Sequence, residues 1–155
     1  MWSHYAENHT GTLIIFSPKT NDSQFSIAKP VVYENSLPEV MSAQDMALLL
    51  TGQISMTDSK SSQKAYDKIT LTKAASWQYE KEWRIAAGDG FSKDKETELN
   101  RFSLDDVEAI IFGVKFPSSN LATFSELASS VYPNARLYRA GLSKRRFGLD
   151  LLDLE

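Results

Sequence analysis

The densest run of aromatic and charged residues in the chain reads Trp77-Gln78-Tyr79-Glu80-Lys81-Glu82-Trp83-Arg84-Ile85. Four of its five odd-numbered positions carry large apolar or aromatic side chains, and its even-numbered positions include Glu80, Glu82 and Arg84. An alternation of period two is typical of a β-strand, whose successive side chains point to opposite faces. We therefore predict a strand over residues 77–85, with the odd-numbered face in a core and the even-numbered face presenting two carboxylates and a guanidinium.

Length and composition indicate a single globular domain spanning residues 1–155. Hydrophobic residues make up 42% of the chain and charged residues 24%, and the net charge of -3 provides no basic surface for nucleic acid or for an acidic membrane. The chain has no cysteine, which excludes disulfides and thiolate chemistry and fits a reducing compartment. No apolar run approaches the roughly 20 residues of a membrane-spanning helix. A cytoplasmic location without membrane contact is the expectation.

Apolar and β-branched runs outside the central segment predict further strands at 12–16, 109–114, 135–140 and 147–152. Residues 25–28 and 31–33 are expected to form either two short strands or one strand interrupted at Pro30. The run at 109–114 is almost continuously apolar, which is typical of a central strand buried on both faces. Residues 88–90 predict a turn, and the highly charged residues 92–101 predict an exposed loop.

Helical spacing of apolar residues and capping residues predict the helices. The first is expected over residues 2–9, ending at Gly11, and a mostly buried helix is expected to follow an N-cap at Ser42. A more solvated helix is expected within 58–76, and another is expected after an N-cap at Ser118 or Ser119, with helical spacing of apolar residues from Leu121 to Val131. The predicted fold class is α+β, with a mixed or antiparallel sheet of about five to seven strands and three or four helices.

Glu80 and Glu82 are the candidate catalytic residues, because side chains two apart on a strand project from one face about 6.5–7 Å apart. Paired carboxylates can divide acid, base and electrostatic roles between them. Arg84 on the same face is a candidate for binding a substrate phosphate or carboxylate. The alternative is a solvated strand face on which Arg84 and Lys81 neutralise the two glutamates.

His4 and Tyr5 are the candidate substrate-binding residues near the start of the chain. On the predicted helix His9 shares the apolar face and is expected to be a core histidine, whereas His4 lies on the polar side beside Glu7. The two histidines point in different directions and do not form a helical metal pair, so no metal site is predicted.

Several blocks of this sequence resemble an uncharacterised bacterial family of unknown function. The blocks are W-S-H-Y-A-x-x-H-x-G, V-x-Y, K-x-x-x-W-x-Y-E-x-E-W-R and I-I-x-G, here residues 2–11, 31–33, 73–84 and 110–113. The resemblance implies a further N-terminal portion before the first block, and because the sequence begins at Met1 the expectation is either a fragment or shortened product, or a family member in which that portion is dispensable. The sheet edge left open by its absence would favour a homodimer.

The same organisation more loosely resembles ADP-ribosyltransferase-type toxins. That likeness implies NAD as the substrate, held by an aromatic or histidine side chain, with a strand glutamate stabilising an oxocarbenium-like transition state. Glu80-Lys81-Glu82 has the E-x-E form that some of those enzymes use.

Two functions remain open. The first is a nucleotide-binding or ADP-ribosyl-transfer-like enzyme of a defence or toxin system, with Glu82 as the catalytic carboxylate assisted by Glu80. The second is a non-catalytic protein-interaction module, in which Glu80, Glu82 and Arg84 form a structural ion network. A glycoside hydrolase fits less well, because neighbours on one strand do not readily flank a sugar from opposite sides.

Overall fold

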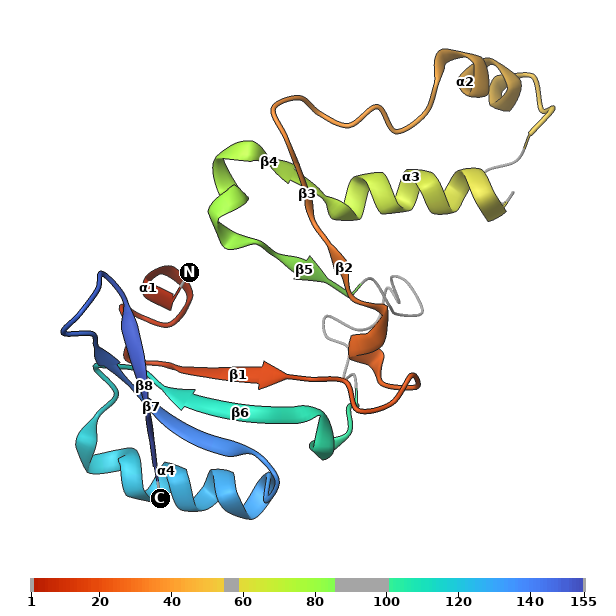
Figure 1. Cartoon of the computed structure of the whole chain (residues 1–155). Helices are drawn as coiled ribbons and strands as arrows, with labels where there is room; N and C mark the ends of the chain where they lie inside the picture. The colour runs from red at the N-terminus through yellow and green to blue at the C-terminus, as the bar shows by residue number, and fades with distance from the viewer. Residues whose placement is uncertain (1, 55–58, 86–100, 155) are drawn as a thin grey trace. The chain divides into compact units, whose positions relative to one another are not determined.

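The computed structural model describes residues 2–54, 59–85 and 101–154, except for the side chains of residues 2, 3 and 59–62 (Figure 1). The turn predicted at 88–90 and most of the charged loop predicted at 92–101 lie outside these residues. The chain divides into two compact units: Met1–Ile27 with Phe91–Glu155, here unit 1, and Ala28–Gly90, here unit 2. Whether they form the single domain predicted from composition stays a prediction.

Unit 1 contains a four-stranded mixed sheet in the order β1-β6-β7-β8. The strands are β1 (Thr12–Phe16), β6 (Val107–Phe112), β7 (Arg136–Leu142) and β8 (Leu149–Asp153). β6 runs antiparallel to β1 and parallel to β7, and β8 runs antiparallel to β7. These strands agree with the runs predicted at 12–16, 109–114, 135–140 and 147–152 to within a few residues at either end.

β6 forms the core of unit 1, as its apolar sequence predicted. Five of its six residues are buried, on both faces of the strand, and β1 and β7 pair with its two edges. Helix α4 (Ser118–Val131) connects β6 to its parallel neighbour β7 and packs on one face of the sheet (Figure 1). Ile110 and Phe112 of β6 share the core with Ala128 of α4.

The N-terminal helix is shorter than predicted. α1 spans Trp2–Tyr5, and Glu7, Asn8 and His9 then adopt positive φ angles of 44°, 55° and 72°. A right-handed helix cannot continue through left-handed residues, so the prediction of a helix through His9 is wrong. The turn is held to the end of β6, where Gly113 N–H donates to the Gly11 carbonyl (3.0 Å).

Unit 2 contains helices α2 (Ala43–Leu50) and α3 (Ser59–Leu71) and two small sheets (Figure 1). One sheet pairs β2 (Lys29–Pro30) with β5 (Trp83–Arg84) in antiparallel register, and the other pairs β3 (Val32–Glu34) with β4 (Thr72–Ala74) in parallel register. Ser42 caps α2 as predicted, accepting the Asp45 N–H. The prediction that α2 is mostly buried is wrong, because none of its residues is buried.

The prediction of a strand over residues 77–85 is also wrong for most of that range. Residues Ala75–Glu80 form a 3-10 helix that ends at Lys81, whose φ of 49° is left-handed, and only β5 remains as a strand. The expected faces are inverted as well: Glu80 is 3% exposed and Trp83 is 64% exposed. A 3-10 helix has three residues per turn, so the period-two alternation no longer assigns side chains to faces.

The described residues contain four α-helices and eight strands, which confirms the α+β class, although the strands are distributed over three sheets rather than one. Within the ranges described, no helix is long and apolar enough to cross a membrane.

Candidate functional site

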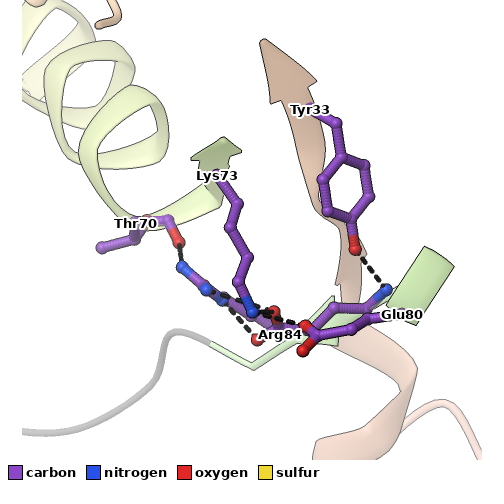
Figure 2. A network of polar contacts seen from close by, with 6 residues as sticks. Tyr33, Thr70, Lys73, Glu80 and Arg84 are labelled. Atoms are coloured by element: carbon purple, nitrogen blue, oxygen red, sulfur yellow. Dashed lines mark hydrogen bonds and ion pairs between the residues drawn. The ribbon is translucent and has the colours of Figure 1, made fainter. Parts of the chain in front are cut away.

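The polar residues of the central segment meet in one network within unit 2 (Figure 2). Lys73 comes from β4, Glu80 ends the 3-10 helix, and Arg84 lies in β5, with Glu82 between the last two. Lys81, which lies between the two glutamates, is left-handed and ends the 3-10 helix. We refer to Lys73, Glu80, Glu82 and Arg84 as the ion network.

Both carboxylate oxygens of Glu82 are occupied by cations of the same chain. Arg84 Nε donates to Oε1 (2.7 Å), whereas Arg84 Nη2 (3.2 Å) and Lys73 Nζ (3.0 Å) both donate to Oε2. This bidentate arrangement of a guanidinium on a carboxylate is among the stronger protein hydrogen-bonding geometries. Glu82 is therefore held from two sides.

Lys73 joins the two glutamates, because its Nζ also donates to Glu80 Oε2. Glu80 is almost fully buried, and a buried carboxylate requires a paired cation or hydrogen-bond donors. Two carboxylates and two cations leave the ion network without formal net charge.

Backbone and neighbouring groups tie the ion network to two further elements (Figure 2). Arg84 Nη1 donates to the carbonyl oxygen of Thr70 in α3. The hydroxyl of Tyr33, in β3, accepts the Glu82 N–H at 2.7 Å. The network thus connects α3, β3, β4, β5 and the 3-10 helix within unit 2.

The contacts within the ion network shift the pKa values of Glu82, Lys73 and Arg84. The Arg84 guanidinium, followed by Lys73, lowers the pKa of Glu82 from 4.5 to about 2. Hydrogen bonding to Glu80 and then to Glu82 raises the pKa of Lys73 well above its usual value, and Glu82 raises the pKa of Arg84. All three groups are charged at neutral pH.

Aromatic side chains lie beside the ion network. Lys73 Nζ is 5.0 Å from the ring centroid of Trp77, within cation–π distance. The rings of Trp77 and Tyr79 are 6.0 Å apart, and both side chains are exposed. The prediction that these aromatics enter a core is therefore wrong.

The other predicted site residues belong to unit 1. His4 and Tyr5 lie in α1, and Tyr5 is exposed. Their assignment as substrate-binding residues stays a prediction. The described residues include no group of three or more His, Asp or Glu side chains placed to hold a metal ion.

Sequence reasoning assigned no role in the site to Lys73, Tyr33 or Thr70. Lys73 and Tyr33 were visible as members of the quoted blocks, 31–33 and 73–84, but spacing alone did not indicate that they meet. Thr70 contributes its backbone carbonyl, for which side-chain chemistry carries no signal.

The family described as Protein of unknown function (DUF2971) matches residues 1–85, more than half of the 155 residues. The chain belongs to this family. The matched range contains α1 and every residue of the ion network, whereas β6, α4, β7 and β8 lie outside it. Comparison with curated proteins found no match, and neither did comparison with solved structures.

Proposed function

We propose that this DUF2971 chain is a non-catalytic protein-interaction module of the bacterial cytoplasm, in which the ion network is a structural element of unit 2. One observation carries the proposal: Arg84 and Lys73 occupy both carboxylate oxygens of Glu82. A catalytic carboxylate acts by directing an oxygen at charge that develops on the substrate. At Glu82 a substrate would first have to displace cations of the protein itself.

The burial of Glu80 and the number of segments that the ion network connects also support a structural role. Glu80 is buried, and the contacts of Lys73 and Arg84 connect segments of unit 2 that are otherwise joined by sheets of only two strands. Removing one partner of a buried ion pair is strongly destabilising, because the other charge is left uncompensated. Such a network stabilises a fold without turning over a substrate.

A second candidate function is nucleotide binding or ADP-ribosyl transfer with NAD as substrate. Two observations favour it: the lowered pKa keeps Glu82 ionised, as a carboxylate facing an oxocarbenium-like transition state must be, and Trp77 with Tyr79 offers exposed rings for stacking on a base. In this candidate Glu82 is catalytic, Glu80 assists and Arg84 binds the substrate, while His4 and Tyr5 stay the candidate substrate-binding residues of unit 1.

Calorimetric titration with NAD and with ATP, combined with urea unfolding, separates the two functions. The proteins are wild type, Glu82→Gln and His4→Ala, with Glu34→Gln as the matched control, because Glu34 is an exposed glutamate of β3 in the same unit. The structural role predicts no nucleotide binding by folded wild type and a lower unfolding free energy for Glu82→Gln than for Glu34→Gln.

Saturable NAD binding by wild type that is lost in His4→Ala, with Glu82→Gln as stable as wild type, would overturn the structural proposal. That result would call for a transferase assay with Glu82→Gln as the inactive reference.

A further inference from the structure

The connection between β7 and β8 carries basic residues that the ion network does not use. Residues 143–148 read Ser-Lys-Arg-Arg-Phe-Gly, and Lys144-Arg145-Arg146 is the one run of three consecutive basic residues in a chain of net charge -3. Figure 1 shows this connection projecting beyond the strands that it joins. We refer to residues 143–148 as the hairpin tip.

Hydrogen bonds within the hairpin hold the backbone of the hairpin tip. The Ser143 N–H donates to the Gly148 carbonyl at 3.1 Å, and the Ser143 hydroxyl accepts the Arg145 N–H at 3.3 Å. Arg146 Nη2 donates to the Leu149 carbonyl at 3.1 Å, which ties the tip to the start of β8. A loop that is ordered before binding loses less conformational entropy when a partner docks on it.

The hairpin tip presents two free cations and one aromatic ring. Phe147 is fully exposed. Within the described residues, the side chains of Lys144 and Arg145 make no hydrogen bond or ion pair. Arg146 differs, because its guanidinium is paired with Asp150 at 3.4 Å. The tip therefore carries two uncompensated positive charges beside an aromatic side chain whose burial against a partner would be favourable.

We propose that the hairpin tip docks on an acidic segment of a partner protein that also carries apolar side chains. The ring of Phe147 is the apolar anchor, and Lys144 and Arg145 pair with carboxylates around it. An apolar centre with a charged rim is the usual anatomy of a protein interface, and the charges set orientation and selectivity. The inference rests on the proposed function and gives the interaction module a docking surface and a class of partner.

The charges around the hairpin tip favour a protein over a continuous polyanion. Asp150 and Asp153 are exposed in β8, which follows the tip. A nucleic acid or an anionic membrane is negatively charged along its whole length or surface, so either would also meet these carboxylates. Two free cations moreover provide few of the phosphate contacts on which binding to nucleic acid depends. A protein segment can place its carboxylates at the tip alone.

Fluorescence anisotropy with short labelled peptides tests this inference on the full chain. The probe is a peptide of glutamate and leucine, and peptides of lysine with leucine and of glutamate with serine, equal in length, are its controls. Wild type is expected to bind the probe saturably. It should bind each control at least about 10-fold more weakly, because one lacks the carboxylates and the other lacks the apolar contact.

Substitutions in the hairpin tip should weaken binding of the probe. Phe147→Ser removes the apolar anchor and should raise the dissociation constant by about 10-fold or more. Lys144→Ser combined with Arg145→Ser should also weaken binding and should reduce its dependence on salt. Lys115→Ser and Leu37→Ser are the matched controls, because they replace an exposed lysine and an exposed leucine outside the tip, and they should bind like wild type.

Urea unfolding of the same variants separates a docking surface from a surface that the folded chain itself covers. Phe147→Ser is expected to unfold with the wild-type free energy, because its side chain is fully exposed. A clear loss of stability would overturn the inference, since the ring would then be packed within the folded chain.

Equal binding of the probe by wild type and Phe147→Ser, or no saturable binding by wild type, overturns the inference. Binding of phosphatidylserine vesicles or of single-stranded oligothymidylate that is lost in Phe147→Ser also overturns it, because the partner would then be a membrane or a nucleic acid. The proposed function fails by a different measurement, namely saturable NAD binding that is lost in His4→Ala, so the two failures are distinguishable.

Discussion

The carbonyl oxygen of His9 occupies the space in which a side chain at residue 113 would begin. A Cβ added to Gly113 would lie 2.0 Å from that oxygen, far inside van der Waals contact. The Lys115 N–H donates to the same carbonyl at 3.1 Å. The left-handed turn after α1 is thereby packed on the end of β6, about one hundred residues later in the chain.

Gly113→Ala is therefore expected to lower the unfolding free energy by about 1–3 kcal/mol, the usual cost of overpacking a close contact. Urea unfolding followed by circular dichroism measures it. Gly148→Ala is the matched control in unit 1, because its Cβ would meet nothing nearer than the Arg146 side chain at 4.0 Å. Equal stability of the two variants would contradict the close approach.

The lowered pKa of Glu82 predicts an acid-dependent loss of stability. The folded-state pKa of about 2 lies below the ordinary value of 4.5, so the unfolded chain binds the proton more readily. The stabilisation is complete above about pH 4.5 and is lost as the pH falls toward about 2.

Urea unfolding from about pH 2 to about pH 6 should show a shallower dependence for Glu82→Gln than for wild type. Glu34→Gln, an exposed glutamate of the same unit, is expected to retain the wild-type slope. A slope unchanged in Glu82→Gln would show that the ion network does not couple protonation to folding.

Lys73→Met should destabilise unit 2 at neutral pH. Lys73 donates to both glutamates, and its loss leaves the buried Glu80 without this cation and removes the charge that separates Glu80 from Glu82. Thermal unfolding compares it with Lys64→Met, which removes an exposed lysine of α3. Equal melting temperatures for the two variants would show that the fold does not depend on the ion network.

Asp106→Ala should destabilise unit 1 by about 2–3 kcal/mol, because it leaves two donors without their acceptor. Asp106 is 2% exposed and accepts from the Lys19 N–H (3.0 Å) and the Ser23 hydroxyl (2.7 Å), which holds the loop after β1 to the start of β6. Asp22→Ala, on the exposed part of that loop, is the control for urea unfolding. A similar free energy for both variants would exclude this anchoring role.

The sequence predicted correctly those helices and strands that depend on a few adjacent residues. The apolar run at β6 predicted a strand buried on both faces, and Ser42 predicted the start of α2, because burial and capping act over a few residues. The spacing of α4 predicted its helix. It did not predict that Phe124, Leu127 and Val131 stay exposed, because burial depends on which other segments pack against the helix.

The sequence by itself determined the α+β class, the central position of β6, and the residues Glu80, Glu82 and Arg84 as the densest chemistry of the chain. Only the tertiary structure decided how those residues are used. The alternation over residues 77–85 predicted a strand, but Lys73 pairs with both glutamates, and a 3-10 helix that ends at the left-handed Lys81 replaces most of that strand. The physical reason is that a buried carboxylate needs a partner charge, and that partner lies outside the segment whose pattern was read.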